Sequence, residues 1–169
     1  MSFKNIKPTE IPGNAIQLIG YDWMLITAGT IDHYNTMTAA WGGLGFLWKE
    51  PYATIFIRPQ RYTYEFTEKS EDFTLSFFNE KFRKALQLCG TKSGRDMDKV
   101  KACGLTPLSS KSGNVYFEEA SLVIECRKVY ADDINPEKFI EPDIQKNYPK
   151  HDYHRMYFGF ITNCLMKTN

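Results

Sequence analysis

Cysteine and histidine are scarce in this chain of 169 residues. The cysteines are Cys89, Cys103, Cys126 and Cys164, and the histidines are His33, His151 and His154. The cysteines are widely separated and form no CxxC pair, and the histidines lack the spacing of zinc ligands. We therefore expect no metal site. Scattered cysteines without a disulfide framework also favour reduced thiols, as in a cytoplasmic protein.

Charge of one sign and long apolar runs are also missing. The formal net charge is only +1, which gives no electrostatic reason to expect binding to nucleic acid or to an anionic membrane. No apolar run approaches the length of a membrane span, and the first residues, MSFKNIKPTEIPG, lack the apolar core of a signal peptide. No GxGxxG motif follows a strand, so a Rossmann-type dinucleotide site is excluded as well. We expect a cytoplasmic protein that binds neither nucleic acid nor membrane.

Aromatic residues, in contrast, are abundant. Twelve Phe, ten Tyr and three Trp make up 15% of the chain, which suits both β-sheet cores and pockets for flat ligands. The length fits one domain, residues 1–169, and no repeat or linker divides it. Many short strands favour a mainly β protein with a closed sheet. The predicted strands are Ala15–Gly20, Trp23–Gly29, Tyr52–Ile57, Phe73–Phe78, Val115–Glu118, Ala120–Val129 and Met156–Ile161.

A few helices interrupt the predicted strands. Asparagine or aspartate before a helix and glycine after it are the usual capping residues. The predicted helices, with these caps, are Glu80–Cys89 between Asn79 and Gly90, and Met97–Cys103 between Asp96 and Gly104. Asn135 followed by Pro136 predicts one more short helix, because proline is favoured in the first turn.

The most informative part of the chain runs from Asn35 to Phe78. A polar turn, NTMTAAWGG, leads into the apolar strand YATIFI, which ends in the basic segment RPQRYT and is followed by FTLSFFN. This order of polar loop, buried strand, paired arginines with a threonine and second buried strand resembles the flavin reductase-like family of FMN-binding split barrels. The resemblance extends from about Ala15 to Ile161. It implies a mainly β split barrel of the Greek-key type, with a few short helices, that binds FMN.

The paired arginines are Arg58 and Arg61. A guanidinium offers a planar fork that matches phosphate oxygens, and Pro59 makes the turn between them reproducible. By the resemblance, the two arginines, with Tyr62 and the hydroxyl of Thr63, hold the FMN phosphate. Taken without the resemblance, RPQR also fits a solvated strand end with two surface arginines.

The residues Asn35, Thr36, Met37 and Thr38 form the second half of the implied site. Small polar side chains let backbone N–H and C=O groups approach the edge of a flat ring closely, and the resemblance places this segment along the isoalloxazine. Trp41 is expected to wall the ring or the space in front of it. The same pattern also fits an ordinary buried strand with a core tryptophan.

The loop TKSGRDMDK, residues 91–99, precedes a predicted helix, where free backbone N–H groups favour an anion. That anion could be the flavin phosphate or the phosphate of a nicotinamide donor. From the resemblance, Ser93, Arg95, Asp96 and Lys99 are further cofactor-binding candidates. The spacing of Ser93 and Asp96 also fits a capping box with exposed charges.

His154 lies in HDYHRMYFGFI, which resembles the last core strand of the family. The resemblance places it at the mouth of the cleft over the flavin, where it can orient a nicotinamide or a substrate. Its imidazole titrates near neutrality and could donate a proton, which makes His154 the candidate catalytic residue. The alternative is a structural histidine whose polar atoms are satisfied at a strand start.

The resemblance implies an oxidoreductase that transfers hydride from NADH or NADPH to flavin, or through bound flavin to a small-molecule acceptor. The chemistry belongs to the cofactors, so the protein need only stack the rings and set the distance. We further expect a homodimer with both flavins at the interface. Two alternatives remain: an electron carrier resembling flavoredoxin that serves another redox protein, and a barrel that binds a small molecule without redox chemistry.

Overall fold

The computed structural model of the chain describes residues 2–168. Strands hold more of these residues than helices do, as the composition predicts. The strands are β1 (Phe3–Ile6), β2 (Met24–Thr30), β3 (His33–Ala39), β4 (Gly42–Leu47), β5 (Glu50–Ile57), β6 (Asp72–Phe77), β7 (Pro107–Ser109), β8 (Val115–Phe117), β9 (Leu122–Asp133) and β10 (Arg155–Lys167). The α-helices are α1 (Tyr62–Lys69), α2 (Arg83–Thr91) and α3 (Lys99–Ala102). Shorter helical turns cover Pro8–Glu10, Gln17–Asp22, Glu80–Phe82, Pro136–Lys138 and Pro142–Asn147.

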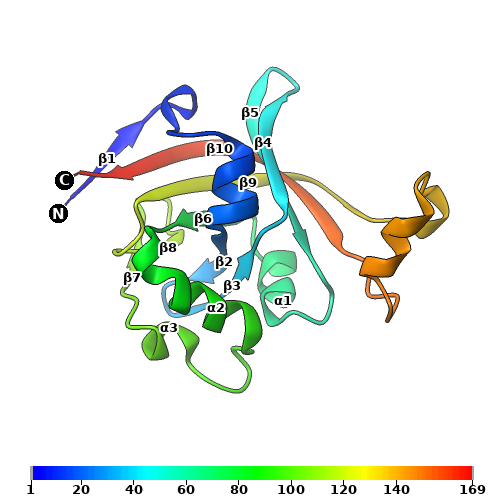
Figure 1. The fold of residues 1–169 in the computed structure, drawn as a ribbon. Coiled ribbons are helices and arrows are strands. Elements are labelled where there is room, and N and C mark those ends of the chain that lie inside the picture. The colour runs from blue at the N-terminus through cyan, green and yellow to red at the C-terminus, as the bar shows by residue number, and fades with distance from the viewer. Residues whose placement is uncertain (1, 169) are drawn as a thin grey trace.

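One antiparallel sheet organises the molecule (Figure 1). Its strand order is β3-β2-β6-β9-β10-β5-β4, and β1 adds to β10. Within residues 2–168 no backbone pairing joins β3 to β4, so the barrel is split at this point. The chain crosses the split between Ala39 and Gly42. The expected mainly β split barrel is confirmed.

The core has two parts, one on each face of the sheet. In β2, Met24 and Ile26 belong to one buried cluster, whereas Leu25 between them belongs to the other. This is the alternation of a strand that is covered on both faces. Leu86 of α2 and Val100 of α3 pack with Leu25. The two helices therefore cover one face of the sheet.

Two predicted strands are longer in the structure. β9 and β10 pair with each other along most of their length, with two irregularities in register, and β10 also pairs with β5 and β1. The other strand predictions from Trp23 onward agree with β2, β5, β6 and β8 within two residues at each end. Ala15–Gly20 is wrong, because Gln17–Asp22 forms a π-helical turn. The less exposed residues of that segment, Ala15, Leu18 and Ile19, follow the i, i+3, i+4 spacing of a helical turn rather than the alternation of a strand.

The polar turn predicted from Asn35 is also wrong, since these residues lie on β3. Their polar groups are satisfied within the sheet: the hydroxyls of Thr36 and Thr27 are 2.9 Å apart on paired strands. The segment after β5 also differs from the prediction, because it contains a helix that the sequence did not indicate. A turn closed by Arg61 N donating to Arg58 O leads directly into α1. Tyr and Thr are weak helix formers, so this helix depends on tertiary burial of residues such as Phe66.

The predicted helix ends shift as well. The helical region after Asn79 begins with a 3₁₀ turn, and the Asn79 side chain makes no capping hydrogen bond. Gly90 lies inside α2 rather than ending it, because its missing side chain lets α2 approach Thr38 of β3. Asp98, not Asp96, caps α3 by accepting a hydrogen bond from Lys101 N. Gly104 follows α3 with a φ of +64°, as expected of a glycine that ends a helix.

The structure also bears on the short helix near Pro136, the cysteines and the expected lack of a membrane span. The short helix at Pro136–Lys138 is confirmed, and the Asn135 side chain caps it by accepting a hydrogen bond from Glu137 N. The cysteines are free, although the sulfur atoms of Cys89 and Cys103 lie 3.8 Å apart. No helix within residues 2–168 combines the length and apolarity needed to cross a membrane.

Candidate functional site

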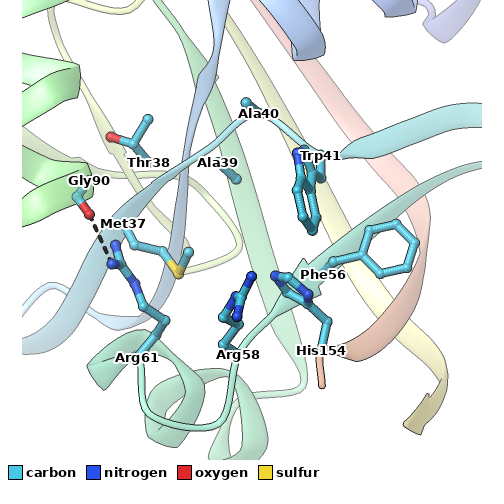
Figure 2. Close-up of a pocket in the computed structure, with 10 residues that line it drawn as sticks. All are labelled: Met37, Thr38, Ala39, Ala40, Trp41, Phe56, Arg58, Arg61, Gly90 and His154. Carbon is cyan, nitrogen blue, oxygen red and sulfur yellow. Dashed lines mark hydrogen bonds between the residues drawn. The ribbon is translucent and has the colours of Figure 1, made fainter. Parts of the chain in front are cut away.

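Two adjoining cavities lie beside β3, next to the split in the barrel. The first, of about 210 Å³, is lined by residues of β3, the chain that crosses the split, the end of β5, Gly90 and His154 (Figure 2). The second, of about 170 Å³, lies between β3, the start of α1 and the loop that follows α2. Met37 and Arg61 line both cavities. The two cavities therefore form one groove with two chemically different ends.

The first cavity has flat aromatic walls. The rings of Trp41 and His154 have centroids 4.9 Å apart, and Phe56 lies edge-on to His154 at 6.4 Å. Ala39 and Ala40 contribute only small side chains, which leaves room beside these rings. Figure 2 shows Trp41 and His154 on one side of the space and Arg61 on the other. A planar ligand suits this shape better than a compact one.

The second cavity is lined by cations and hydroxyls. Its lining residues are Asn35, Met37, Gln60, Arg61, Tyr62, Thr63, Thr91, Lys92, Ser93, Gly94 and Lys99. Among residues 2–168, none of its three cations, Arg61, Lys92 and Lys99, forms a salt bridge with a carboxylate. A concave surface with three unneutralised cations and several hydroxyls has the chemistry of an anion site, and above all of a phosphate site.

Lys99 is the most unusual of these cations because it is 96% buried. Its ammonium donates to the carbonyl oxygens of Thr36 at 2.6 Å and of Cys89 at 3.1 Å. Burial lowers the pKa of Lys99, and the neighbouring thiol of Cys89 opposes that shift. Two carbonyls satisfy hydrogen bonds but do not neutralise the charge. An anion in the second cavity would do so.

Arg61 stands at the junction of the two cavities, at the N-cap of α1. It donates to the carbonyl oxygen of Gly90 at 2.8 Å, the bond drawn in Figure 2. Burial, and secondarily the charge of Arg58, lower the pKa of Arg61. Only one nitrogen of its guanidinium is engaged by a hydrogen bond within the described residues, so other guanidinium N–H groups are free to bind a ligand.

Arg58 has a different environment, although it is only three residues away. Its guanidinium donates to Asp152 at 2.6 Å and to the carbonyl oxygen of Asn147 at 2.9 Å. It also lies over the ring of Tyr148, 5.0 Å from the centroid. Arg58 lines the first cavity only. The structure thus separates the two arginines: Arg61 serves both cavities, and Arg58 holds the segment before β10.

His154 lies directly before β10 and is buried against the first cavity. Its Nδ1 is 2.9 Å from the hydroxyl of Tyr148. Burial lowers the pKa of His154 to about 4, with a smaller contribution in the same direction from Arg58 and an opposing one from Asp152. The imidazole is therefore neutral at pH 7, which does not fit the idea that it enters the reaction as a charged acid.

The polar residues predicted on β3 and α1 contact one another. Thr63 is fully buried, and its hydroxyl accepts a hydrogen bond from Asn35 Nδ2 at 2.8 Å. Asn35 in turn packs against Gly94, where an added Cβ would lie only 2.1 Å from Asn35 Oδ1. This contact brings the loop after α2 onto β3. Thr36 and Thr38 tie β3 to its surroundings by donating to Ile26 O and Leu86 O.

The candidates from the loop after α2 divide into two groups. Ser93 and Lys99 line the second cavity, together with Tyr62 of α1. Arg95 and Asp96 lie outside the lining of both cavities. Arg95 pairs with Glu65 and lies over the ring of Tyr62, and Asp96 N donates to Ser93 O in a turn. The structure brings eleven of the thirteen cofactor-binding candidates beside the groove, on its lining or directly behind it.

Sequence reasoning missed several groups. Gln60 and Lys92 line the second cavity and Phe56 and Gly90 line the first. Lys92 lies within the loop of residues 91–99, so its charge could have identified it as a further anion-binding candidate. The contacts of Tyr148 and Asp152 gave no such signal, because they join residues that are distant from Arg58 in the sequence.

The comparisons with known proteins agree with this arrangement. The model of the family described as "Flavin reductase like domain" matches residues 17–168. The chain belongs to this family. A comparison with curated proteins gives no match.

Several solved structures share the fold. An FMN-binding domain of a flavin reductase-like enzyme from Shewanella baltica superposes with a TM-score of 0.71 at 18% identity, covering 98% of this chain and 77% of that one. Flavoredoxin of Desulfovibrio vulgaris superposes with a TM-score of 0.68 at 21% identity, covering 96% of this chain and 77% of flavoredoxin. An NADH:FAD oxidoreductase of Streptomyces globisporus superposes with a TM-score of 0.65 at 14% identity, covering 86% of this chain and 75% of the oxidoreductase. At these identities the likeness establishes the fold shared by the family members.

Proposed function

We propose that this chain binds FMN and transfers hydride from NADH or NADPH to the flavin, or through it to a small-molecule acceptor. The observation that carries the proposal is the groove with two unlike ends. Flat aromatic walls line the first cavity, unneutralised cations line the second, and Arg61 joins them. FMN has the same division, with a flat ring at one end and a doubly charged phosphate at the other.

The donor set of the second cavity fits the phosphate. Arg61 and Lys92 supply charge, and Ser93, whose hydroxyl only accepts a hydrogen bond from Arg95 N, supplies a hydroxyl donor. Lys99 adds a buried ammonium without a carboxylate partner among residues 2–168. Charge-assisted hydrogen bonds of this type are about twice as strong as neutral ones. These residues are the ones that would hold the FMN phosphate.

The first cavity then receives the flavin ring and the nicotinamide or acceptor. Bound FMN supplies the hydride chemistry, and the chain supplies orientation. Met37 and Thr38 would lie along the ring, while Trp41 and His154 would border the space in front of it. Because the imidazole is neutral and no other ionisable side chain apart from the arginines lines this cavity, we assign no general acid.

Ligand binding tests the first half of the proposal. The purified protein, reconstituted with FMN, should be yellow, and calorimetric titration should give a lower Kd for FMN than for riboflavin. Riboflavin is the matched control because it carries the same ring without the phosphate. Equal affinity for the two ligands would contradict the proposed phosphate site. If the protein retains neither ligand, a barrel that binds a different small molecule is favoured.

Anaerobic rapid mixing tests the second half. FMN-loaded protein should bleach on mixing with NADH or NADPH, and steady-state oxidation of one of the two should depend on added flavin. Among the structural neighbours, the Streptomyces globisporus protein is named as an NADH:FAD oxidoreductase and the Desulfovibrio vulgaris protein as a flavoredoxin. FMN binding without NAD(P)H oxidation would therefore favour the second candidate, an electron carrier for another redox protein.

We also propose a homodimer. Three aromatic side chains beside the first cavity and on the hairpin of β4 and β5 are solvent-exposed: Trp41 at 44%, Phe46 at 72% and Trp48 at 57%. Exposed aromatic residues of this kind are typical of protein interfaces. Light scattering of the FMN-loaded protein should report twice the mass of the chain. A monomer with full flavin occupancy would contradict the dimer and leave these side chains for the redox partner of the alternative.

A further inference from the structure

The connection between β9 and β10, residues 134–154, ends at His154, which lines the groove. The connection contains the helical turns Pro136–Lys138 and Pro142–Asn147. Figure 1 shows it extending away from the sheet before the chain returns to β10. It carries Tyr148, which is 97% buried and packs against the rings of Phe139 and Tyr153. The Tyr148 hydroxyl reaches His154 Nδ1 at 2.9 Å.

This hydrogen bond can be formed in two ways. Either the phenol donates to an unprotonated Nδ1, or Nδ1–H donates to the phenol oxygen. The described residues offer the Tyr148 hydroxyl no other partner, so the second arrangement would leave a buried phenol proton without an acceptor. A phenol is also the better donor of the two groups, and an imidazole nitrogen the better acceptor. Both considerations favour donation by the phenol.

The charged groups around the imidazole permit this arrangement. Arg58 lies near His154 and would by itself disfavour an N–H directed toward it. Its guanidinium, however, is paired with Asp152 and donates hydrogen bonds to Asp152 and to Asn147 O. The other walls around the ring, Trp41 and Phe56, carry no charge.

We propose that Tyr148 is a positioning residue that holds His154 as the neutral tautomer protonated at Nε2. His154 then presents a single N–H donor to the first cavity. The group that it recognises is a hydrogen-bond acceptor, either a carbonyl oxygen or an unprotonated ring nitrogen of the flavin, the nicotinamide or the acceptor. The identity of this occupant rests on the proposed function, whereas the tautomer does not.

A fixed tautomer limits what His154 can offer to a ligand. A histidine that can switch tautomers presents a donor or an acceptor to its ligand at different times. The Tyr148 contact removes that freedom, and Arg58 over the Tyr148 ring keeps the phenol in place. Because burial lowers the pKa of His154 to about 4, the neutral form persists through the neutral range.

Nitrogen-15 NMR of the histidine rings in the flavin-free wild-type protein tests the tautomer directly. Protonated and unprotonated imidazole nitrogens have well separated shifts, and His154→Asn identifies the signals. At pH 7 we expect a protonated Nε2 and an unprotonated Nδ1. A protonated Nδ1, or a charged ring, would overturn the proposal. The expected tautomer in a protein that binds no FMN would refute the proposed function alone.

Tyr148→Phe tests the positioning role, because it keeps the ring and removes the hydroxyl. We expect the fixed tautomer to become a mixture and kcat with NAD(P)H to fall roughly three- to tenfold, the range for loss of one neutral hydrogen bond. The Kd for FMN should stay unchanged. Tyr153→Phe is the matched control, since that hydroxyl bonds His151 and Gln145 and not the site. An unchanged kcat in Tyr148→Phe, despite a changed tautomer, would overturn the positioning role.

Discussion

The two ends of the groove use cationic side chains in opposite ways. At the end near the loop after α2, Arg61, Lys92 and Lys99 have no carboxylate partner among the described residues. At the end near β10, Arg58 is neutralised by Asp152 and lies over the ring of Tyr148. Only the second cavity is therefore prepared for an anion, whereas at the first cavity Arg58 is already paired with Asp152 beside a neutral histidine.

The difference shows that proximity in the sequence is a poor guide to role. Arg58 and Arg61 share one short segment and one residue type. What separates them is the partner that each meets in the fold, because a guanidinium already paired in a partly buried site has little left to offer a ligand. The comparison can be tested at both ends.

The largest effect is expected at the junction of the cavities. Arg61→Ala should raise the Kd for FMN roughly tenfold to a hundredfold, the range for loss of a charge-assisted hydrogen bond. The Kd for riboflavin should change little. Isothermal titration with both ligands measures this difference. Arg95→Ala is the matched control, because Arg95 pairs with Glu65 and lines neither cavity. A similar loss for riboflavin would show that Arg61 supports the ring or the fold instead.

A second effect concerns the loop that carries the hydroxyls. In Gly94→Ala the new methyl group would overlap Asn35 Oδ1, so the loop must move away from β3. We expect roughly a tenfold weaker Kd for FMN, in line with the usual cost of overpacking. Gly20→Ala serves as control, because nothing lies within 4 Å of a Cβ at that position. Fluorescence titration of flavin distinguishes the two variants, and equal affinities would contradict the contact.

A third effect is a pH dependence at the neutral end. Between pH 6.5 and about 4 the unfolded chain protonates His154 while the folded chain does not. The unfolded state then binds more protons, so the free energy of unfolding falls as pH is lowered through this window and rises as pH increases. His154→Gln should reduce this fall by roughly 1–3 kcal/mol. Urea unfolding at several pH values measures it, with the exposed His33→Gln as control.

The smallest effect is expected from breaking the pair at the neutral end. Asp152→Asn removes the charge opposite Arg58. It should lower the free energy of local opening of residues 134–153 by about 1–2 kcal/mol and change the Kd for FMN less than threefold. Trypsin should then cleave faster after Lys146 or Lys150. Asp143→Asn, which disturbs an exposed pair with Lys146, is the control. A large gain in FMN affinity would mean that Asp152 shields a second phosphate-binding arginine, and that the two ends are more alike than we propose.

The fold class was readable from the sequence because strand alternation is a local property. β2, β5, β6 and β8 emerge from short runs of β-branched and aromatic residues. The turn at Gln17–Asp22 and helix α1 were not readable, since their conformation depends on which few side chains become buried. The resemblance carried by Asn35–Thr63 led to the right family, and it named most of the residues that line the groove.

What the sequence determined by itself is the kind of protein: a mainly β chain of the flavin reductase-like family with basic and hydroxyl residues in two recognisable segments. Tertiary structure decided which of those residues are free to act. Asp152 neutralises Arg58 across 94 residues of chain, and Tyr148 forms a hydrogen bond with His154. Burial places the amine of Lys99 among carbonyl oxygens and lowers its pKa. These are long-range contacts, and the charge and protonation state of a side chain depend on such neighbours and on burial rather than on its place in a motif.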